Sequence, residues 1–150
     1  MDRKELKKKI FDFCMQLQVR QMESVQEEMH EAFQNAKEYG TPEDWLDTYK
    51  MDMLNKRDAC GVQLQKIIEE IKTLERIDPS IIIDEVTFGA VVFTETQKLI
   101  IATGMGKIII DDETYHAISP TVPLYHAIKG LKAGDTFEFR GEKNKILEVF

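Results

Sequence analysis

Four carboxylates gather in one short stretch of the chain, at Glu38, Glu43, Asp44 and Asp47. Glu43 and Asp47 are four residues apart and Asp44 and Asp47 are three apart, so on a helix they share one side. Carboxylate oxygens suit Mg²⁺, which usually takes one or two carboxylates and leaves its other positions to water or to a partner. Such a set could complete a metal site in another protein but could not hold the ion firmly by itself. We therefore expect no cofactor bound to the chain alone.

The same acids also have a purely structural explanation. Thr41-Pro42-Glu43-Asp44 has the composition of a helix start, with Thr as the N-cap, Pro at the first helical position and acids in the first turn. Acids there stabilise a helix through its dipole by roughly 0.3–1 kcal/mol each. Capping and metal binding both remain open for Glu43 and Asp44.

Two long helices are expected on either side of this stretch. Gly40 ends the first and Pro42 begins the second, so the chain reverses and the helices run antiparallel. Apolar residues recur at spacings of three and four, with one slip between Leu17 and Met22 that suggests a stutter. The apolar positions are Leu6, Ile10, Phe13, Leu17, Met22, Val25, Met29, Phe33 and Ala36 on the first helix, and Cys60, Leu64, Ile67, Ile71 and Leu74 on the second. We predict an antiparallel coiled-coil hairpin over residues 1–77, with its tip at 38–47.

The hairpin geometry also predicts which residues face one another. With the turn centred near residue 41, each residue faces the one whose number brings the sum to roughly 82, which puts Cys14 near Ile68 and Cys60 near Met22. The two cysteines should therefore not meet, and both are interpreted as small core residues. Helices of this length exceed those of ordinary globular proteins, and a long hairpin is a shape suited to reaching into a partner.

After Asp78-Pro79 the pattern changes to short, largely β-branched segments. Strands are expected at 81–83, 86–88, 90–93, 99–102 and 107–110, then a short helix at 124–130, and a final hairpin of 136–140 and 145–149 around Gly141. These segments would build a small domain over residues 78–150. The expected fold class is α+β: a long antiparallel coiled-coil hairpin followed by a small β-sheet domain with one short helix.

Composition and charge limit the classes of function. A net charge of −7 argues against free DNA binding, which needs clustered Lys and Arg. The basic run from Arg3 to Lys9 is interpreted as a solvated helix start, with a binding role as the alternative. No apolar stretch approaches the roughly 20 residues that span a bilayer. The basic N-terminus lacks the apolar region of a signal peptide, so we expect a cytoplasmic protein without membrane contact. With no nucleophile–base pair and no Gly-rich phosphate loop in the sequence, the chain is not expected to be an enzyme by itself.

Several landmarks, in this order, resemble the bacterial Gre-type transcript cleavage factors. Ala36-Lys37-Glu38-Tyr39-Gly40 before an acidic turn resembles the tip of that family. The second half is similar to its C-terminal domain at Phe88-Gly89-Ala90, Ile118-Ser119-Pro120, Gly130 and Gly134-Asp135. The resemblance implies an N-terminal coiled coil that enters the secondary channel of RNA polymerase, and an FKBP-like C-terminal domain that docks at the channel rim.

The resemblance also assigns roles to tip residues. Acids at the family's tip help to hold a second Mg²⁺, shared with the polymerase active site, so that the polymerase cleaves its own backtracked RNA by two-metal hydrolysis. Here the assisting acids would be Asp44, Glu43 and Asp47, with Asp44 and Glu43 as ligands of the shared Mg²⁺. The contacts to the polymerase or to the 3′ end of the nascent RNA would be Lys37, Thr41 and Trp45.

The tip departs from the family pattern, and this leaves the outcome of binding open. Thr41 stands where the family has Asp, Asp44 where it has Glu, and Glu43 and Asp52 where it is basic. Cleavage could be stimulated, with Glu43 replacing the missing acid, or the hairpin could only occupy the channel as an inhibitor or regulator. A prolyl isomerase, from the FKBP-like domain, and a coiled-coil adaptor or dimer are the alternatives from other classes.

Overall fold

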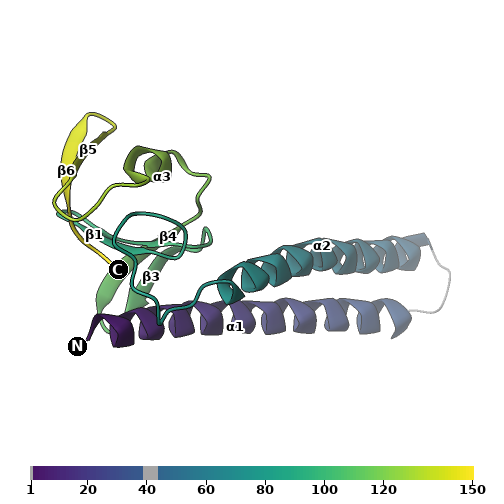
Figure 1. The fold of residues 1–150 in the computed structure, drawn as a ribbon. Helices are drawn as coiled ribbons and strands as arrows, with labels where there is room; N and C mark the ends of the chain where they lie inside the picture. The colour runs from purple at the N-terminus through teal and green to yellow at the C-terminus, as the bar shows by residue number, and fades with distance from the viewer. Residues whose placement is uncertain (1, 39–43) are drawn as a thin grey trace. The chain divides into compact units, whose positions relative to one another are not determined.

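Two long helices begin the chain in the computed structural model, α1 (Arg3–Glu38) and α2 (Asp44–Glu75) (Figure 1). The structure describes the backbone of residues 2–38 and 44–150, and their side chains except at 33, 35–38, 44–50 and 53. Contacts group the chain into two compact units, one of Met1–Cys14 with Thr73–Phe150 and one of Met15–Lys72. We call them the sheet unit and the hairpin unit. The first turns of α1 thus pack with the sheet. The predicted division into domains of residues 1–77 and 78–150, each continuous in sequence, stays a prediction.

The hairpin unit is held together by one apolar cluster between α1 and α2. Val25, Cys60 and Ile67 are buried, and the partly buried residues that pack on them are Met22, Met29, Leu64 and Ile71. All of these residues belong to the predicted stripes, and their spacing of three and four keeps them on facing sides of the two helices. The expected helical hairpin is therefore confirmed for the part of the chain that is described.

The register of the two helices differs from the prediction. Gln18 contacts Glu70 and Cys60 contacts Glu28, and in both pairs the residue numbers add up to 88 instead of about 82. Side chains on a helix lean toward its N-terminus by about one residue. In an antiparallel pair the side chains of the two helices therefore point in opposite directions along the hairpin axis. Two residues whose side chains meet are each about one position later in the sequence than the residues whose Cα atoms lie level with each other. This lean explains about two of the six residues of difference.

The second helix ends where its sequence requires. Its last turn tightens, with Arg76 N–H donating to Thr73 O and Ile77 N–H to Leu74 O. Pro79 then disfavours a helical conformation for Asp78, whose carboxylate instead accepts from the backbone N–H of Ser80 at 2.9 Å and from its hydroxyl at 2.6 Å.

Six strands form one mixed sheet in the order β3-β4-β2-β1-β6-β5. Their bounds are β1 (Val91–Thr94), β2 (Lys98–Ile101), β3 (Gly106–Ile110), β4 (Glu113–Ile118), β5 (Thr136–Phe139) and β6 (Glu142–Val149), and α3 (Pro123–Ile128) lies between β4 and β5. The β2–β4 pair is parallel and the other four pairs are antiparallel. This small sheet with one short helix, after two long helices, confirms the expected α+β fold class; the likeness to FKBP stays a prediction.

Some strand predictions were right and others were wrong. The β5–β6 hairpin turns at Arg140 and Gly141, both with positive φ, as expected around Gly141. Residues 81–83 and 86–88 form no strand, and in that region only a single bridge joins Glu85 to Lys132. The prediction also missed β4, which pairs with β3 through a two-residue turn at Asp111 (φ 51°) and Asp112 (φ 64°). Two consecutive Asp residues, which tolerate positive φ, were the available signal.

The sheet is covered on both faces. On one face Val92, Leu99, Ile101 and Ile146 pack with Tyr125 and Ile128 of α3. On the other, Arg3 of α1 lies over the Phe93 and Phe150 rings, at 5.6 and 5.3 Å from the centroids, and Ile10 and Phe11 are buried. Figure 1 shows α3 on one side of the sheet and the start of α1 on the other. A sheet this small has too little area for a large core of its own, so the helical cover adds to its burial.

Candidate functional site

The predicted tip site lies at the edge of what the structure describes. Thr41 and Glu43 are outside the described residues. Asp44 is the first residue of α2, with Trp45 and Asp47 in the same first turn, and Lys37 lies in the last turn of α1. The side chains of these four are not among those described, so the metal, RNA and capping roles stay predictions. Among the described residues, no three His, Cys, Asp or Glu side chains are placed to hold a metal ion.

A polar pair, with one member buried, joins the two helices that carry the tip. Gln18 is 1% exposed, and its Nε2 donates to Glu70 Oε2 at 2.8 Å. The Gln18 side-chain oxygen is buried without a hydrogen-bond partner. Sequence reasoning missed Gln18 because it followed apolar residues alone.

The buried stripe of α1 explains the slip that the sequence showed. The buried positions are Lys7, Ile10, Phe11, Cys14, Gln18, Val25 and Ala32, and with the partly buried Met22 and Met29 they follow spacings of three and four, except that Ile10 and Phe11 are adjacent. Leu6, Phe13 and Leu17, which were expected in the seam, are only half-buried. The apparent stutter thus arose from assigning core positions to apolar residues one place away from two buried polar ones.

The basic start of α1 is exposed at Arg3, Lys4 and Lys8, as expected of a solvated run, but Lys7 is buried and other members form ion pairs. Arg3 pairs with Glu148 and Lys9 with Asp111, both in the sheet unit. Lys7 is fully buried, and its Nζ donates to the backbone O of Ile81 at 2.8 Å. Burial lowers the pKa of Lys7 from 10.5 to about 8, an effect that the charge of Asp78 partly offsets. Three of the five basic residues therefore bind other parts of the sheet unit, at Glu148, Asp111 and Ile81.

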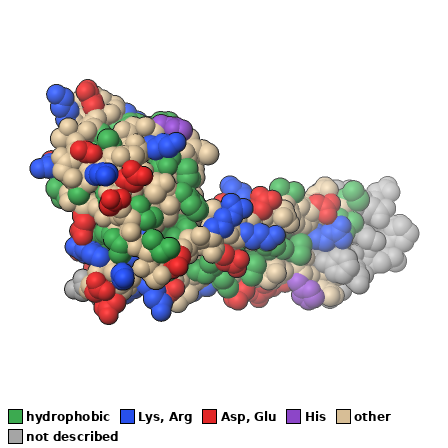
Figure 2. All heavy atoms as spheres, in the orientation of Figure 1, with side chains coloured by type: hydrophobic (Ala, Val, Ile, Leu, Met, Phe, Trp, Pro, Cys, Tyr) green, Lys and Arg blue, Asp and Glu red, His purple; other side chains and the backbone are tan. Residues whose placement is uncertain are grey.

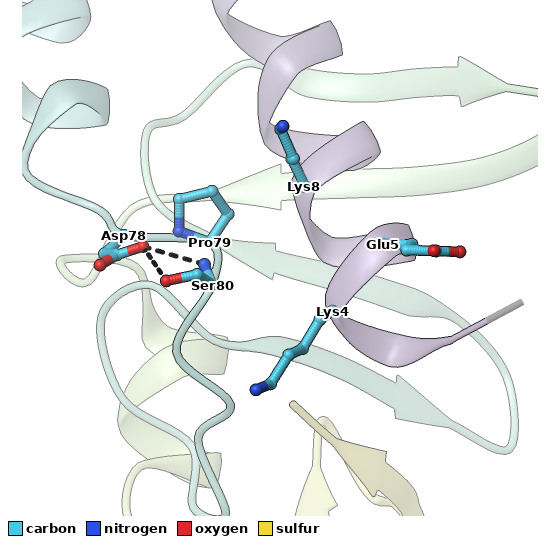
Figure 3. A pocket seen from close by; sticks show the side chains of 6 residues that line it. All are labelled: Lys4, Glu5, Lys8, Asp78, Pro79 and Ser80. Carbon is cyan, nitrogen blue, oxygen red and sulfur yellow. Dashed lines mark hydrogen bonds between the residues drawn. The ribbon is translucent and has the colours of Figure 1, made fainter.

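The two remaining lysines, Lys4 and Lys8, line a shallow pocket of about 330 Å³ with Glu5, Asp78, Pro79 and Ser80. Asp78 and Ser80 are turned toward each other, and Glu5 points away from them (Figure 3). The hydrogen bonds from Ser80, with a smaller effect of Lys7, hold the pKa of Asp78 below its usual value. The ionised carboxylate is thus already satisfied within the chain.

Among the described residues, the cysteines and the charged side chains give no sign of a reaction centre. Cys14 and Cys60 are free and buried, in agreement with the expectation that they do not meet. Burial raises the pKa of the Cys14 thiol to about 12, which keeps it protonated and unreactive.

Figure 2 shows acidic and basic side chains mixed along the described helices on the face drawn. Within the described chain, no helix is both long enough and apolar enough to span a bilayer.

These features define a class of protein: two long helices followed by a small mixed sheet, with clustered acids in the sequence where the first helix ends and the second begins. No model of a known protein family matches the chain, and no curated protein matches it.

Solved structures give the remaining comparison. The GreA factor homolog 1 (Gfh1) protein of Thermus thermophilus is similar over 91% of this chain and 94% of its own, at 15% identity and a TM-score of 0.34. Gfh1 of Thermus aquaticus is similar over 89% of this chain and 92% of its own, at 16% identity and a TM-score of 0.32. Likenesses of this size carry no argument about family or function.

Proposed function

We propose that the chain is a Gre-like transcription elongation factor. It binds RNA polymerase, inserts its coiled-coil hairpin into the secondary channel, and stimulates or modulates the cleavage of backtracked RNA. The observation that carries the proposal is the order of parts: helices of 36 and 32 residues with acids clustered where they adjoin in sequence, then a small sheet with one short helix. This is the order that the sequence resemblance to Gre factors implies.

The landmarks of that resemblance in the second half occupy positions where the local geometry requires them. Gly89 has φ +89°, and an added Cβ would lie 3.4 Å from Ile77 Cγ2. Gly130 and Gly134 have φ +79° and +92°, a region that L side chains rarely adopt. Ser119 begins the turn before α3, where its hydroxyl oxygen accepts from the Thr121 N–H at 3.3 Å. The match therefore involves residues that shape the backbone, which supports a shared architecture more than matches at surface positions would.

The role of the chain in cleavage would be to bring carboxylates to the polymerase active site. Asp44 and Asp47 share the first turn of α2, and Glu43 precedes it directly in sequence. Carboxylates from one turn approach an ion from one side only, so the remaining ligands must come from the polymerase. Mg²⁺ held there would stabilise the charge that develops on the phosphate during hydrolysis. Lys37, Thr41 and Trp45 would contact the channel or the RNA 3′ end.

The test uses purified RNA polymerase in backtracked elongation complexes, with cleaved RNA measured on gels and polymerase binding measured separately. We expect the wild-type chain to accelerate cleavage and Asp44→Asn to reduce the acceleration by about 10²-fold or more, as removal of a group that stabilises transition-state charge does. Glu31→Gln, an exposed acid on α1, is the control and should leave the acceleration unchanged.

Each outcome decides between the versions of the proposal. Binding without any gain in cleavage would support the channel-occupying regulator and exclude the stimulatory version. Acceleration that survives in both Asp44→Asn and Glu43→Gln would exclude the metal-holding role of the tip. A chain that binds no polymerase, but self-associates, would be the coiled-coil adaptor, and the proposal would be wrong.

A further inference from the structure

We propose that Gln18, acting through Glu70, fixes the register in which α1 and α2 pair. Gln18 lies inside the hairpin unit, 1% exposed, and its amide nitrogen donates to Glu70 Oε2 at 2.8 Å. The inference concerns the hairpin itself and holds whatever partner the chain has.

The apolar contacts around this pair specify register poorly. Met22, Val25 and Met29 on α1 have spacings of three and four, as do Leu64, Ile67 and Ile71 on α2. Sliding one helix by a turn, about 5.4 Å, therefore sets apolar residues against apolar residues again. Met adapts its shape to whatever surrounds it, so two of the three α1 positions tolerate the slide.

The polar pair does not tolerate it. Gln18 is on the same stripe as Met22 and Val25, four and seven residues before them, and Glu70 follows Ile67 by three. A slide of one turn would bring Gln18 opposite positions three or four residues from Glu70, which hold Lys66 and Ile67 or Thr73 and Leu74, so the carboxylate acceptor would be lost. A buried amide without a partner costs more than the hydrogen bond is worth when formed, so the penalty selects one register.

The orientation of the amide is determined by its partner. The nitrogen must face the Glu70 carboxylate, because the opposite flip would bring two oxygens together. This leaves Gln18 Oε1 buried and unpaired. The native register thus carries an unsatisfied group, as expected for a residue that gives specificity at the expense of stability.

The proposal is tested by distance measurements between spin labels at Gln21→Cys and Asn55→Cys. Both positions are exposed, whereas Cys14 and Cys60 are buried, so the labels attach at the introduced sites. The two positions are displaced along the hairpin axis, so a slide of one turn would change their separation by up to about 5 Å. The intact chain should give one narrow distance.

Gln18→Leu should raise the urea concentration at the unfolding midpoint and at the same time produce a second distance. Gln18→Met, which is closer in shape, repeats the test in case Leu disturbs the packing. Glu70→Gln keeps an acceptor and should keep one distance, and the exposed Gln16→Leu is the matched control that should also keep one. A single unchanged distance in both Gln18 variants would overturn the proposal, because a purely stabilising or destabilising residue would change the midpoint without adding a second register.

Discussion

Replacing the buried Lys7 by Met should make the chain more stable than wild type at neutral pH and less stable at high pH. Lys7 has a pKa of about 8 in the folded chain against 10.5 when free, because burial disfavours its charged form. Below pH 8 the lysine is charged in both the folded and the unfolded chain, and folding then bears the full cost of burying the charge. Between pH 8 and 10.5 the folded chain binds fewer protons than the unfolded one, so the free energy of unfolding rises with pH. Above 10.5 the cost is gone.

The magnitude follows from the two pKa values. The two pKa values differ by about 2.5, and a difference of one corresponds to about 1.36 kcal/mol. Burying the charged lysine therefore costs about 3 kcal/mol. Lys7→Met removes this cost but also removes the 2.8 Å hydrogen bond to Ile81 O, worth about 1 kcal/mol. The variant should therefore be more stable than wild type by about 2 kcal/mol at pH 7 and less stable by about 1 kcal/mol near pH 11.

The assay is urea unfolding at pH 7, 8.5, 10 and 11, followed by near-ultraviolet circular dichroism of the buried Tyr115 and Tyr125 in the sheet unit. Other groups titrate in this range, and Cys14, with its pKa raised to about 12, changes stability in the opposite direction. The difference between wild type and variant cancels these contributions. Lys8→Met, at an exposed neighbouring position, should show a constant difference at all pH values. If the free energies of wild type and Lys7→Met change in parallel from pH 7 to 11, the burial argument is refuted.

Two further substitutions should stabilise the chain, and both are measured by urea unfolding at pH 7. Gly61→Ala should add about 1 kcal/mol, because Gly is that much less favourable than Ala inside a helix and an added Cβ at this position meets nothing within 4 Å; a loss of stability would mean that this helix approaches something closely in solution. Asp112→Gly should add on the order of 0.5 kcal/mol, because Asp112 has φ 64° at the second position of a two-residue hairpin turn, where Gly is preferred. Asp111→Gly is its control and should gain less, since it also loses the ion pair with Lys9.

The sequence predicted the helices and part of the sheet because each rests on a local signal. Helical spacing along α1 and α2 identified the hairpin, and Pro123 and Gly141 marked the start of α3 and the last turn. The segment 81–83 misled the prediction because three β-branched residues favour a strand only when another strand pairs with them. In the fold, the Ile81 carbonyl accepts instead from a lysine 74 residues earlier in the chain. No local pattern contains that partner.

The candidate tip site was predictable only as a set of residue types at helical spacing. Asp44 and Asp47 do fall in one helical turn, which the spacing required. The spacing could not predict which groups the basic residues at the other end of α1 bind. Arg3 and Lys9 bind acids of the sheet unit that are more than a hundred residues away in sequence. These contacts depend on the tertiary fold, so the local run of basic residues did not predict them.

Lys7 and Gln18 are the two fully buried polar side chains among those described in α1. A buried polar side chain favours the native arrangement when its hydrogen bond forms there and in few other arrangements. Lys7 selects the position of the segment at Ile81, and Gln18 selects the pairing with Glu70. Apolar residues give this helix most of its burial but repeat every turn, so they cannot distinguish one register from the next. The slip in the apolar pattern therefore marks Gln18, a residue that specifies the pairing of the helices and that a search for hydrophobic periodicity overlooks.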